Sequence, residues 1–474
     1  NGYIVSWCVG HLVELAPPEE YDEKYADRFN MENLPIIPHE YKFVISSNTQ
    51  KQFNVLKKLM SDSRVSELVC ATDAGREGEC IFRYVYTAAK CRKPFLRLWT
   101  SSLEESALRE GFKNLRNSQD YDNLYAAGLS RAQADWLVGM NGTRLFSNRY
   151  KAALSIGRVQ TPTLAMIVDR DFKVQNFIKE KYFTVELDCG FTAETERIDE
   201  QQKAESLCTA CSGGMASVTE VKKEVKTINP PKLYDLTTLQ REANRKYGYT
   251  AQQTLDYVQS LYEKKLCSYP RTDSQYITSD MENTARNIVT ILGTKIPEMQ
   301  TAGQPNISCI INNAKVSDHY ALMPTAQIED KDLSELPDGE RNILLMIAAK
   351  LICAVSDPHK YEAVTVMLFC AGSPFKATGK TVINNGWKAC ERRINEKFRA
   401  KPDEDASSDE AEKPVTVLPA VQQGQNLNVT AAQTKEHWTS PPKSYTEDTL
   451  LSAMEHAGNA DYSDDEDVEK KGLG

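Results

Sequence analysis

The organisation of the chain is clearest at residues 68–79, which read Leu68-Val-Cys-Ala-Thr-Asp73-Ala-Gly-Arg76-Glu77-Gly-Glu79. An apolar run of strand character, Leu68–Thr72, passes through a turn into a helix that begins near Glu77. Open α/β sheets place their sites at the carboxyl ends of strands. Mg²⁺ prefers one or two carboxylates together with water and phosphate oxygens, so Asp73 and Glu77 are candidate magnesium ligands. The alternative is an Asp N-cap followed by the acidic first turn of an ordinary helix.

The segments on either side of this stretch alternate between strand and helix patterns. Strands are expected at Tyr3–Trp7 and Phe95–Trp99, and helices at Gln50–Met60 and Glu77–Lys90. This alternation predicts an α/β layer. Residues 103–176 then follow with a strongly helical pattern.

Beyond Tyr182 the pattern changes to strands that enclose a helical insert. The expected strands are Phe183–Phe191, Ala216–Lys226, Tyr361–Cys370 and Leu427–Ala431. The insert, about residues 235–355, contains the expected helices Leu236–Tyr247, Thr250–Lys264, Asp280–Ile291 and Asp338–Val355. A last helix is expected at Thr446–His456. The chain is therefore predicted to leave a β domain, build a helical one and return.

Composition narrows the class of protein without identifying it. Among the 474 residues no apolar run approaches the ~20 needed to cross a bilayer. The 12 cysteines are mostly isolated in apolar stretches, which is typical of reduced thiols in a cytosolic protein. One Cys-x-x-Cys pair, Cys208 and Cys211, is expected to be two thiols in a loop rather than a zinc or redox site.

Net charge does not decide whether the chain binds nucleic acid. The formal charge is −9, but two acidic runs near residues 403–412 and 461–469 carry twelve carboxylates, and the remainder is +3. Local patches must therefore decide. The first run lies in the low-complexity segment Lys401–Lys413, which we expect to be disordered.

A tyrosine before a proline offers a nucleophile. Pro270 biases Tyr269 toward an extended conformation, which places Arg271 on the same side of the chain. A phenol is a weak nucleophile at neutral pH, and a guanidinium could favour its oxyanion and bind a phosphate in a fork. The alternative is a buried Tyr at a helix exit, with Asp273 pairing Arg271.

A basic stretch and a histidine could contact nucleic acid. Asn141–Gln160 carries four cations and no acid, with Trp136 and Tyr150 nearby, a combination that suits a single-strand groove or equally a solvated helix face. His319, one of six histidines, could donate a hydrogen bond or a proton to a phosphate, or be structural.

One apparent phosphate loop is dismissed. Gly372 and Gly379-Lys380-Thr381 have six residues between the glycines, where the Walker motif needs four. The sequence therefore predicts no ATP site.

Taken together and in order, these motifs resemble the type IA DNA topoisomerases, and most closely bacterial DNA topoisomerase III. The motifs are Val9-Gly-His11-Leu-Val-Glu-Leu15, Ala71–Glu79, Ala134-Asp-Trp136-Leu-Val-Gly139, Ser155–Pro162, Pro230–Gln240, Ser268–Ser274 and Asp318–Thr325. The resemblance runs essentially from end to end of the chain. Each motif is moderately specific, and the ordered set is very specific.

The resemblance implies a multidomain fold of α/β, α and β parts in a toroidal arrangement. The implied domains are Toprim at 1–110, helical core at 111–180, β arch at 181–232, helical gate at 233–356, returning arch at 357–432 and second core part at 433–474. The arch would lift the gate, which brings Tyr269 against the Toprim carboxylates.

The resemblance also implies a mechanism. Tyr269 would attack single-stranded DNA and leave a 5′-phosphotyrosine, with no need for ATP, while Arg271 stabilises charge and His319 holds the scissile phosphate. Asp73 and Glu77 would hold Mg²⁺ for religation. The implied strand-binding residues are Trp136, Arg144, Ser155, Ile156, Gly157, Arg158, Val159, Gln160 and Arg271. Strand passage would relax negatively supercoiled DNA or unlink catenated DNA. We expect a monomer in the bacterial cytoplasm, at the nucleoid, with no membrane partner.

Two departures from the family pattern limit these expectations. The family commonly has a second Asp two positions after the first, where this chain has Gly75. The first Toprim strand, with its Glu and Lys, and the end of the core domain are expected to be missing, so this fragment is expected to relax DNA poorly. The alternatives are a catalytically inactive single-strand-binding protein, a Toprim nuclease or primase, and topoisomerase I proper.

Overall fold

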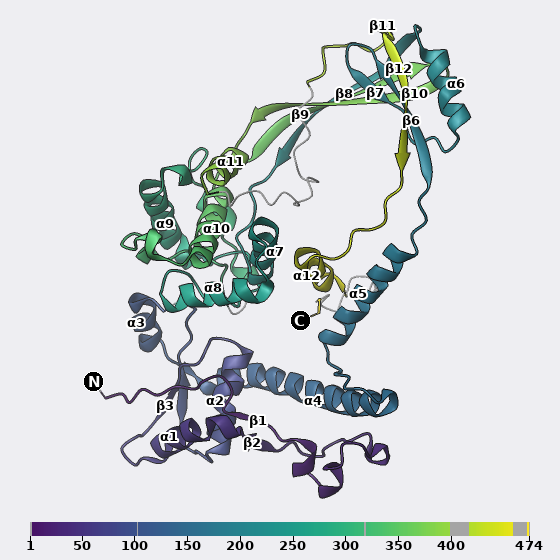
Figure 1. Cartoon of the computed structure of the whole chain (residues 1–474). Helices are drawn as coiled ribbons and strands as arrows, with labels where there is room; N and C mark the ends of the chain where they lie inside the picture. The colour runs from purple at the N-terminus through teal and green to yellow at the C-terminus, as the bar shows by residue number, and fades with distance from the viewer. Residues whose placement is uncertain (1, 102, 317–318, 399–416, 458–471, 474) are drawn as a thin grey trace.

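A computed structural model describes residues 2–101, 103–316, 319–398, 417–457 and 472–473. The elements are arranged around an open centre, so that the chain forms a ring (Figure 1). An α/β unit and one long helix make the base, and a β-sheet lies at the opposite end. A second long helix rises from the base toward this sheet on one side, and a helical unit lies between base and sheet on the other. The predicted combination of α/β, helical and β parts is confirmed.

The α/β unit contains small sheets packed between helices. Its elements are β1 (Val13–Leu15), β2 (Phe43–Ile45), α1 (Gln50–Ser61), β3 (Leu68–Cys70), α2 (Arg76–Ala88), β4 (Phe95–Arg97), α3 (Glu105–Lys113) and β5 (Arg116–Asn117). Strands β3 and β4 are parallel, with Cys70 opposite Arg97. The core includes Val13 of β1, Phe53 of α1 and Val85 of α2. The helices expected at Gln50–Met60 and Glu77–Lys90 are confirmed within two residues at each end.

Two long helices continue from this unit. They are α4 (Asp122–Tyr150) and α5 (Gln160–Gln175). Helix α4 ends at Lys151, whose backbone is left-handed at φ 55°, a conformation that stops a helix. Residues 151–159 then form the loop that joins the two helices.

The distant β-sheet is rolled on itself. Its strands are β6 (Lys181–Asp188), β7 (Thr192–Glu194), β8 (Met215–Ile228), β9 (His359–Cys370), β10 (Ser373–Asn384), β11 (Asn426–Asn428) and β12 (Ala431–Trp438). The order is β11-β8-β9-β10-β7-β6-β12, which puts β11 and β12 at opposite edges. Only two residues join β11 to β12, and two residues span about 7 Å, so the two edges must lie side by side. Helix α6 (Gln201–Cys211) adds Ala204 and Cys211 to the core of this sheet.

Strands β8 and β9 extend from the rolled sheet to the helical unit (Figure 1). They pair antiparallel from Ser217 opposite Phe369 to Ile228 opposite His359. The register shifts between Val218 and Glu220, which marks a β-bulge.

The helical unit holds one continuous apolar core. Its helices are α7 (Leu236–Tyr247), α8 (Ala251–Glu263), α9 (Glu282–Lys295), α10 (Asp338–Ala354) and α11 (Trp387–Phe398). The four helices expected between residues 236 and 355 are confirmed. Helix α11 was not expected, yet its buried Cys390 and Ile394 belong to the same core. The last helix, α12 (Glu447–Glu455), confirms the expectation for that region and packs against α7.

Two strand predictions are wrong. Residues 3–7 form no strand, and Tyr3, Val5 and Trp7 are exposed. Apolar and β-branched residues favour a strand only where a neighbour takes up its backbone hydrogen bonds, and no described strand pairs with this segment. Residues 427–431 form the end of β11 and the start of β12 instead of one strand.

Other sequence expectations are also tested by the fold. Cys208 and Cys211 lie on α6 and not in a loop. Burial raises the pKa of the Cys211 thiol to about 12, which disfavours the thiolate that binds metal. Residues 379–381 lie within β10, not in a phosphate loop. Segment 401–413 lies outside the described residues. None of the described helices is long and apolar enough to span a membrane.

Candidate active site

Residues 71–75, the Asp73 loop, join β3 to α2 and are fixed by a very close approach of the helix. A Cβ added to Gly78 would lie 1.9 Å from the carbonyl oxygen of Asp73. Only glycine therefore fits this position. The Thr72 hydroxyl donates to the carbonyl oxygen of Gly78 at 2.8 Å. The side chain of Asp73 is left exposed at the carboxyl end of β3.

A fully buried arginine on the neighbouring strand β4 also holds the Asp73 loop in place. Arg97 on β4 donates through Nη1 to the carbonyl oxygens of Cys70 and Thr72, at 3.1 and 2.7 Å, and through Nη2 to that of Asp73 at 2.5 Å. Its Nε lies 2.6 Å from Oε1 of the buried Glu79. The sequence did not single out Arg97 for any role. The available signal was a cation within the apolar strand Phe95–Leu98.

Glu79 is committed to structure and does not face the site. Besides Arg97, its Oε2 pairs with Arg83 at 2.9 Å. Two guanidinium groups offset the cost of burying this carboxylate. Of the three acids between residues 73 and 79, only Asp73 and Glu77 therefore present exposed side chains.

Tyr269 lies directly against the Asp73 loop. Its side chain follows α8 and is 8% exposed. The phenol donates to Oδ2 of Asp73 at 3.1 Å, and the backbone N–H donates to the carbonyl oxygen of Ser101 at 3.2 Å. Burial, and then the charge of Asp73, raise the pKa of the phenol well above its usual value, while Arg271 opposes the shift. The phenol is therefore neutral and hydrogen-bonded to a carboxylate.

His319 and Arg271 complete the surroundings of the phenol. The buried His319 ring has its centroid 4.3 Å from that of Tyr269, and its backbone oxygen accepts from the Thr272 hydroxyl at 3.1 Å. A Cβ on Gly75 would lie 4.0 Å from Nε2 of His319. Arg271 is exposed, and its charge lowers the pKa of both Tyr269 and Glu77. The structure thus brings together Tyr269, Arg271, His319 and Asp73.

Glu77 has a partner that the sequence did not assign. Nε2 of His11 lies 3.0 Å from Oε1 of Glu77. This hydrogen bond, more than any other influence, lowers the pKa of Glu77 below its usual value. His11 lies just before β1 in one of the quoted motifs, and the scarcity of histidine was the one signal of a role.

The donor set at the Asp73 loop fits Mg²⁺. Two exposed carboxylates, Asp73 and Glu77, lie at the start of α2. In the described part of the chain no cluster of three His, Cys, Asp or Glu side chains has metal-binding geometry. Magnesium commonly takes one or two protein carboxylates and completes its shell with water and phosphate oxygens, so this sparse set suits it better than a closed protein cage.

Two of the expected strand-binding residues pack against residues 16–41, Trp136 half-buried and Arg144 buried. The indole N–H of Trp136 donates to the carbonyl oxygen of Ala16 at 2.9 Å, and its ring packs between Tyr21 and Tyr41. Arg144 is 7% exposed and donates to the carbonyl oxygen of Tyr25 at 2.8 Å. These side chains hold α4 against residues 16–41.

Five of the other expected strand-binding residues, 155–159, lie in the loop between α4 and α5, and Gln160 is the first residue of α5. Arg271 lies near Tyr269, as described above. Gly142 lets Ile156 pack closely on α4, since a Cβ there would lie 2.9 Å from Cγ2 of Ile156. Arg158 donates through Nε to Asp135 at 2.8 Å. Of these six residues, Ser155, Arg158 and Gln160 are exposed, and Ile156, Gly157 and Val159 are half-buried. This segment is the part of the expected groove that presents polar groups outward.

Two protein-family models together match nearly the whole chain. A family model described as DNA topoisomerase matches residues 119–474. A Toprim domain model matches residues 1–103. The boundary between the two matches falls before helix α4.

Comparison with individual proteins agrees. The chain is 39% identical over 468 residues to DNA topoisomerase 3 of Bacillus subtilis (strain 168), covering 96% of this chain and 63% of that protein. It is also 39% identical to DNA topoisomerase 3 of Bacillus licheniformis, covering 96% and 62%. The chain thus spans about three fifths of the length of these relatives. The full-length topoisomerase I structure from Thermotoga maritima matches with a TM-score of 0.70 at 24% identity, covering 95% of this chain and 71% of that one, which shows a shared fold.

Proposed function

The chain belongs to the type IA DNA topoisomerase family, and from this premise we propose that it cleaves and reseals one strand of DNA through Tyr269. The observation that carries the proposal is the contact between the phenol of Tyr269 and Oδ2 of Asp73, at 3.1 Å. It joins the expected nucleophile on one unit to the expected acidic loop on another, 196 residues away in the chain.

We assign the cleavage chemistry to residues already described. The phenolic oxygen of Tyr269 attacks the phosphorus as its bond to the 3′ oxygen breaks, which gives a 5′-phosphotyrosine and a free 3′-hydroxyl. Asp73 accepts the phenolic hydrogen in the closed ring, and so can take that proton as the attack begins. Asp73 then passes this proton through water to the leaving 3′ oxygen, so the proton lost by the phenol balances the one gained by the 3′-hydroxyl. Because the phosphoester bond energy is retained, resealing needs no ATP.

Arg271 and His319 act on the phosphate. The exposed guanidinium of Arg271 favours the phenolate and can share charge with the phosphate oxygens, a contribution worth about 3 kcal/mol or more in comparable sites. His319, packed on the ring of Tyr269, holds the scissile phosphate beside the nucleophile. Tyr269 must exchange its bond to Asp73 for this phosphate.

Asp73 and Glu77 would hold Mg²⁺, which supplies positive charge that aligns the broken ends for religation. His11 holds Glu77 in place and lowers its pKa, so that this carboxylate stays ionised. Gly75 leaves open space beside His319 where the family commonly has a second carboxylate.

The proposed substrate is single-stranded DNA within negatively supercoiled or catenated DNA. The strand would follow the loop Ser155–Gln160 toward the Asp73 loop. Trp136 and Arg144 would shape this path indirectly, since both hold α4 in place. Passage of a second strand through the ring would change the linking of the DNA.

A denaturing gel tests the proposal. The chain is incubated with Mg²⁺ and oligonucleotides labelled separately at each end, and protein-linked label is measured. We expect the protein to be linked to the 5′ end of the fragment downstream of the break, so that label at the 3′ end of the oligonucleotide stays with the protein. The adduct should be lost in Tyr269→Phe, and binding of the strand should be retained. A Tyr262→Phe variant, which changes the ring packed on Tyr269 at 5.4 Å, controls for altered packing. Binding with no adduct in the unchanged chain would instead support a single-strand-binding protein.

A further inference from the structure

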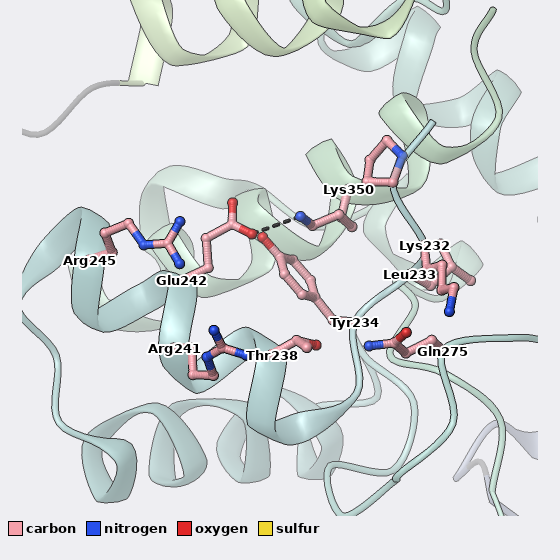
Figure 2. A pocket seen from close by; sticks show the side chains of 10 residues that line it. Lys232, Leu233, Tyr234, Thr238, Arg241, Glu242, Arg245, Gln275 and Lys350 are labelled. Atoms are coloured by element: carbon pink, nitrogen blue, oxygen red, sulfur yellow. Dashed lines mark hydrogen bonds and ion pairs between the residues drawn. The ribbon is translucent and has the colours of Figure 1, made fainter. Parts of the chain in front are cut away.

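Helix α7 borders a pocket that is rich in positive charge. The pocket has a volume of about 290 Å³ and lies between α7, residues 231–234 and α10. Four cationic side chains line it, Lys232, Arg241, Arg245 and Lys350, against the single carboxylate of Glu242. Figure 2 shows these side chains around the ring of Tyr234.

The one carboxylate in the wall is already neutralised. Oε2 of Glu242 lies 2.7 Å from Lys350, and Oε1 lies 3.0 Å from Lys246. Burial alone would raise the pKa of Glu242, but Lys350 and Lys246 outweigh it and hold the pKa at about 2. Glu242 therefore does not offset the charge of Lys232, Arg241 and Arg245.

The two arginines bind a carboxylate from another part of the ring. Asp448 on α12 accepts from Nε of Arg241 at 2.9 Å and from Nε of Arg245 at 3.2 Å. Glu455 of the same helix lies 3.4 Å from Arg241. Two guanidinium groups around one anion are also an arrangement that binds phosphate, because carboxylate and phosphate both present pairs of oxygen acceptors that match the planar guanidinium fork.

The charges on α7 and α12 are not needed to start these helices. Residues 230–239 and 441–450 share the pattern Pro-Pro-Lys-x-Tyr-x-x-x-Thr-Leu. Each helix begins with a capping box, Asp235 with Thr238 and Thr446 with Thr449. The two segments thus start alike, yet α7 carries the arginines and α12 carries the carboxylates that meet them.

The pocket is tied to the loop that carries Tyr269. The backbone N–H of Leu236 donates to the carbonyl oxygen of Thr272 at 3.1 Å. The side chain of Gln275, which also lines the pocket, donates to Asp235 at 2.9 Å. An anion held by α7 therefore moves with the nucleophile.

We propose that Arg241 and Arg245, with Lys232 in the wall of the same pocket, form a second binding site for a backbone phosphate of single-stranded DNA, and that Asp448 competes for the two guanidinium groups in the closed ring. The inference rests on the proposed function for the identity of the strand. When α7 and α12 separate, the carboxylate leaves, and a phosphate of the strand takes its place on the two guanidinium groups.

Salt-dependent DNA binding tests the site. Binding of a fluorescein-labelled oligothymidylate is followed by anisotropy over a range of KCl concentrations. Asp448→Asn removes the competing charge and keeps the shape, so we expect about two- to fivefold tighter binding, the size of one partly exposed ion pair. The slope of log affinity against log salt should steepen by about 0.7 for each phosphate gained. Adding Arg241→Gln to Asp448→Asn should abolish both gains.

Matched controls separate the site from general charge. Asp256→Asn, an exposed change on α8, removes the same charge away from the pocket and should leave the slope unchanged. Thermal melting of each variant establishes that it is folded. A wild-type slope in Asp448→Asn, or a gain that survives Arg241→Gln, would overturn the proposal.

Inorganic phosphate distinguishes a strand from a free ion. At constant ionic strength it should raise the melting temperature of Asp448→Asn less than the oligonucleotide does. Stabilisation by phosphate together with an unchanged oligonucleotide slope would show a free-ion site and overturn the role in DNA binding.

The covalent adduct is measured on the same samples, so that this site and the proposed cleavage are tested separately. A normal adduct with unchanged slopes refutes this site alone, whereas a missing adduct with the expected slopes refutes the proposed cleavage alone.

Discussion

The helical unit closes the ring through two contacts of opposite character. At one, Tyr269 is 8% exposed and packs with His319 over the Asp73 loop. At the other, α7 meets α12 through ion pairs, and the side chains of Arg241 and Asp448 are 24% and 14% exposed. The contact at the Asp73 loop is made by the buried phenol of Tyr269 and its neighbouring rings. The contact between α7 and α12 is made by charged side chains that are partly exposed to solvent.

This difference suggests different roles for the two contacts: the buried one positions Tyr269, and the ionic one can open and close. A buried contact on a rigid loop sets the place of the nucleophile within a narrow range. Partly exposed ion pairs contribute little each and weaken as salt rises. The buried contact therefore holds Tyr269 against the Asp73 loop, and we expect the ionic contact between α7 and α12 to open more readily.

The largest expected effect is a loss of stability on removing Arg97, which holds the Asp73 loop in place. Arg97→Met leaves Glu79 with only Arg83 and removes the donor from the Asp73 loop. Breaking such a buried pair should lower the free energy of unfolding by about 3–5 kcal/mol, measured by urea unfolding of the α/β unit. Arg64→Met, which breaks an exposed pair with Asp62, should change stability far less. Equal losses would contradict the comparison.

A smaller effect is expected from Glu242, a half-buried carboxylate on the ionic side that is paired with two lysines. The pKa of Glu242 is about 2 when folded, against about 4.3 when unfolded. Its contribution, at most about 3 kcal/mol, is present above pH ~4.3 and is lost as the pH falls toward 2. Glu242→Gln should therefore be less stable at pH 7 and converge with the unchanged chain in acid, in urea unfolding at a series of pH values. A difference that stays constant with pH would refute this account.

Gly78→Ala should disturb the position of Asp73. The added Cβ would overlap the carbonyl oxygen of Asp73, so the loop must shift away from Tyr269. Displacement of about 1 Å can lower activity by about 100-fold, and we expect about 10- to 100-fold less adduct on the denaturing gel. Gly293→Ala on α9 is the control, because its nearest neighbour would be an ordinary 3.7 Å away. An unchanged adduct in Gly78→Ala would show that the loop tolerates the shift.

The smallest effect is the response of the ionic contact to salt. Raising KCl should lower the protection of α12 amides against hydrogen exchange, by less than about 1 kcal/mol. The amides of α2, behind the buried contact, should keep their protection. Exchange by mass spectrometry over residues 447–455 and 76–88 measures both. Loss of protection in both segments would mean that the contacts do not differ in this way.

The helices of the helical unit were predictable because local signals agreed. Helices α7 and α8 each have a capping box and an apolar stripe, so sequence alone located their starts. Helix α11 was missed because its apolar face is short, with Cys390 and Ile394 as its only buried residues. The rolled sheet could not be predicted, since its closure depends on edges that meet through β11 and β12.

The sequence predicted the residues of the candidate site, but not the residues that hold them in position. The residues alone left Tyr269 and Asp73 ambiguous, and the ordered family motifs placed them together. Arg97 was missed because its role depends on the parallel pairing of β3 with β4, which puts it opposite Cys70. Arg144 has the charge expected of a strand-binding residue, yet packing decides that it is buried. Charge patterns cannot show which face of a helix is covered.

The β-bulge between Val218 and Glu220 is a place where strand β8 can bend. From Glu220 to Ile228 the strand β8 runs roughly 26 Å toward the helical unit, at about 3.3 Å per residue. A bend of about 20° at the bulge would swing the far end by roughly 9 Å without breaking the pairing between β8 and β9. Because β8 is long, a small change of angle at the bulge would therefore produce a large displacement of the helical unit.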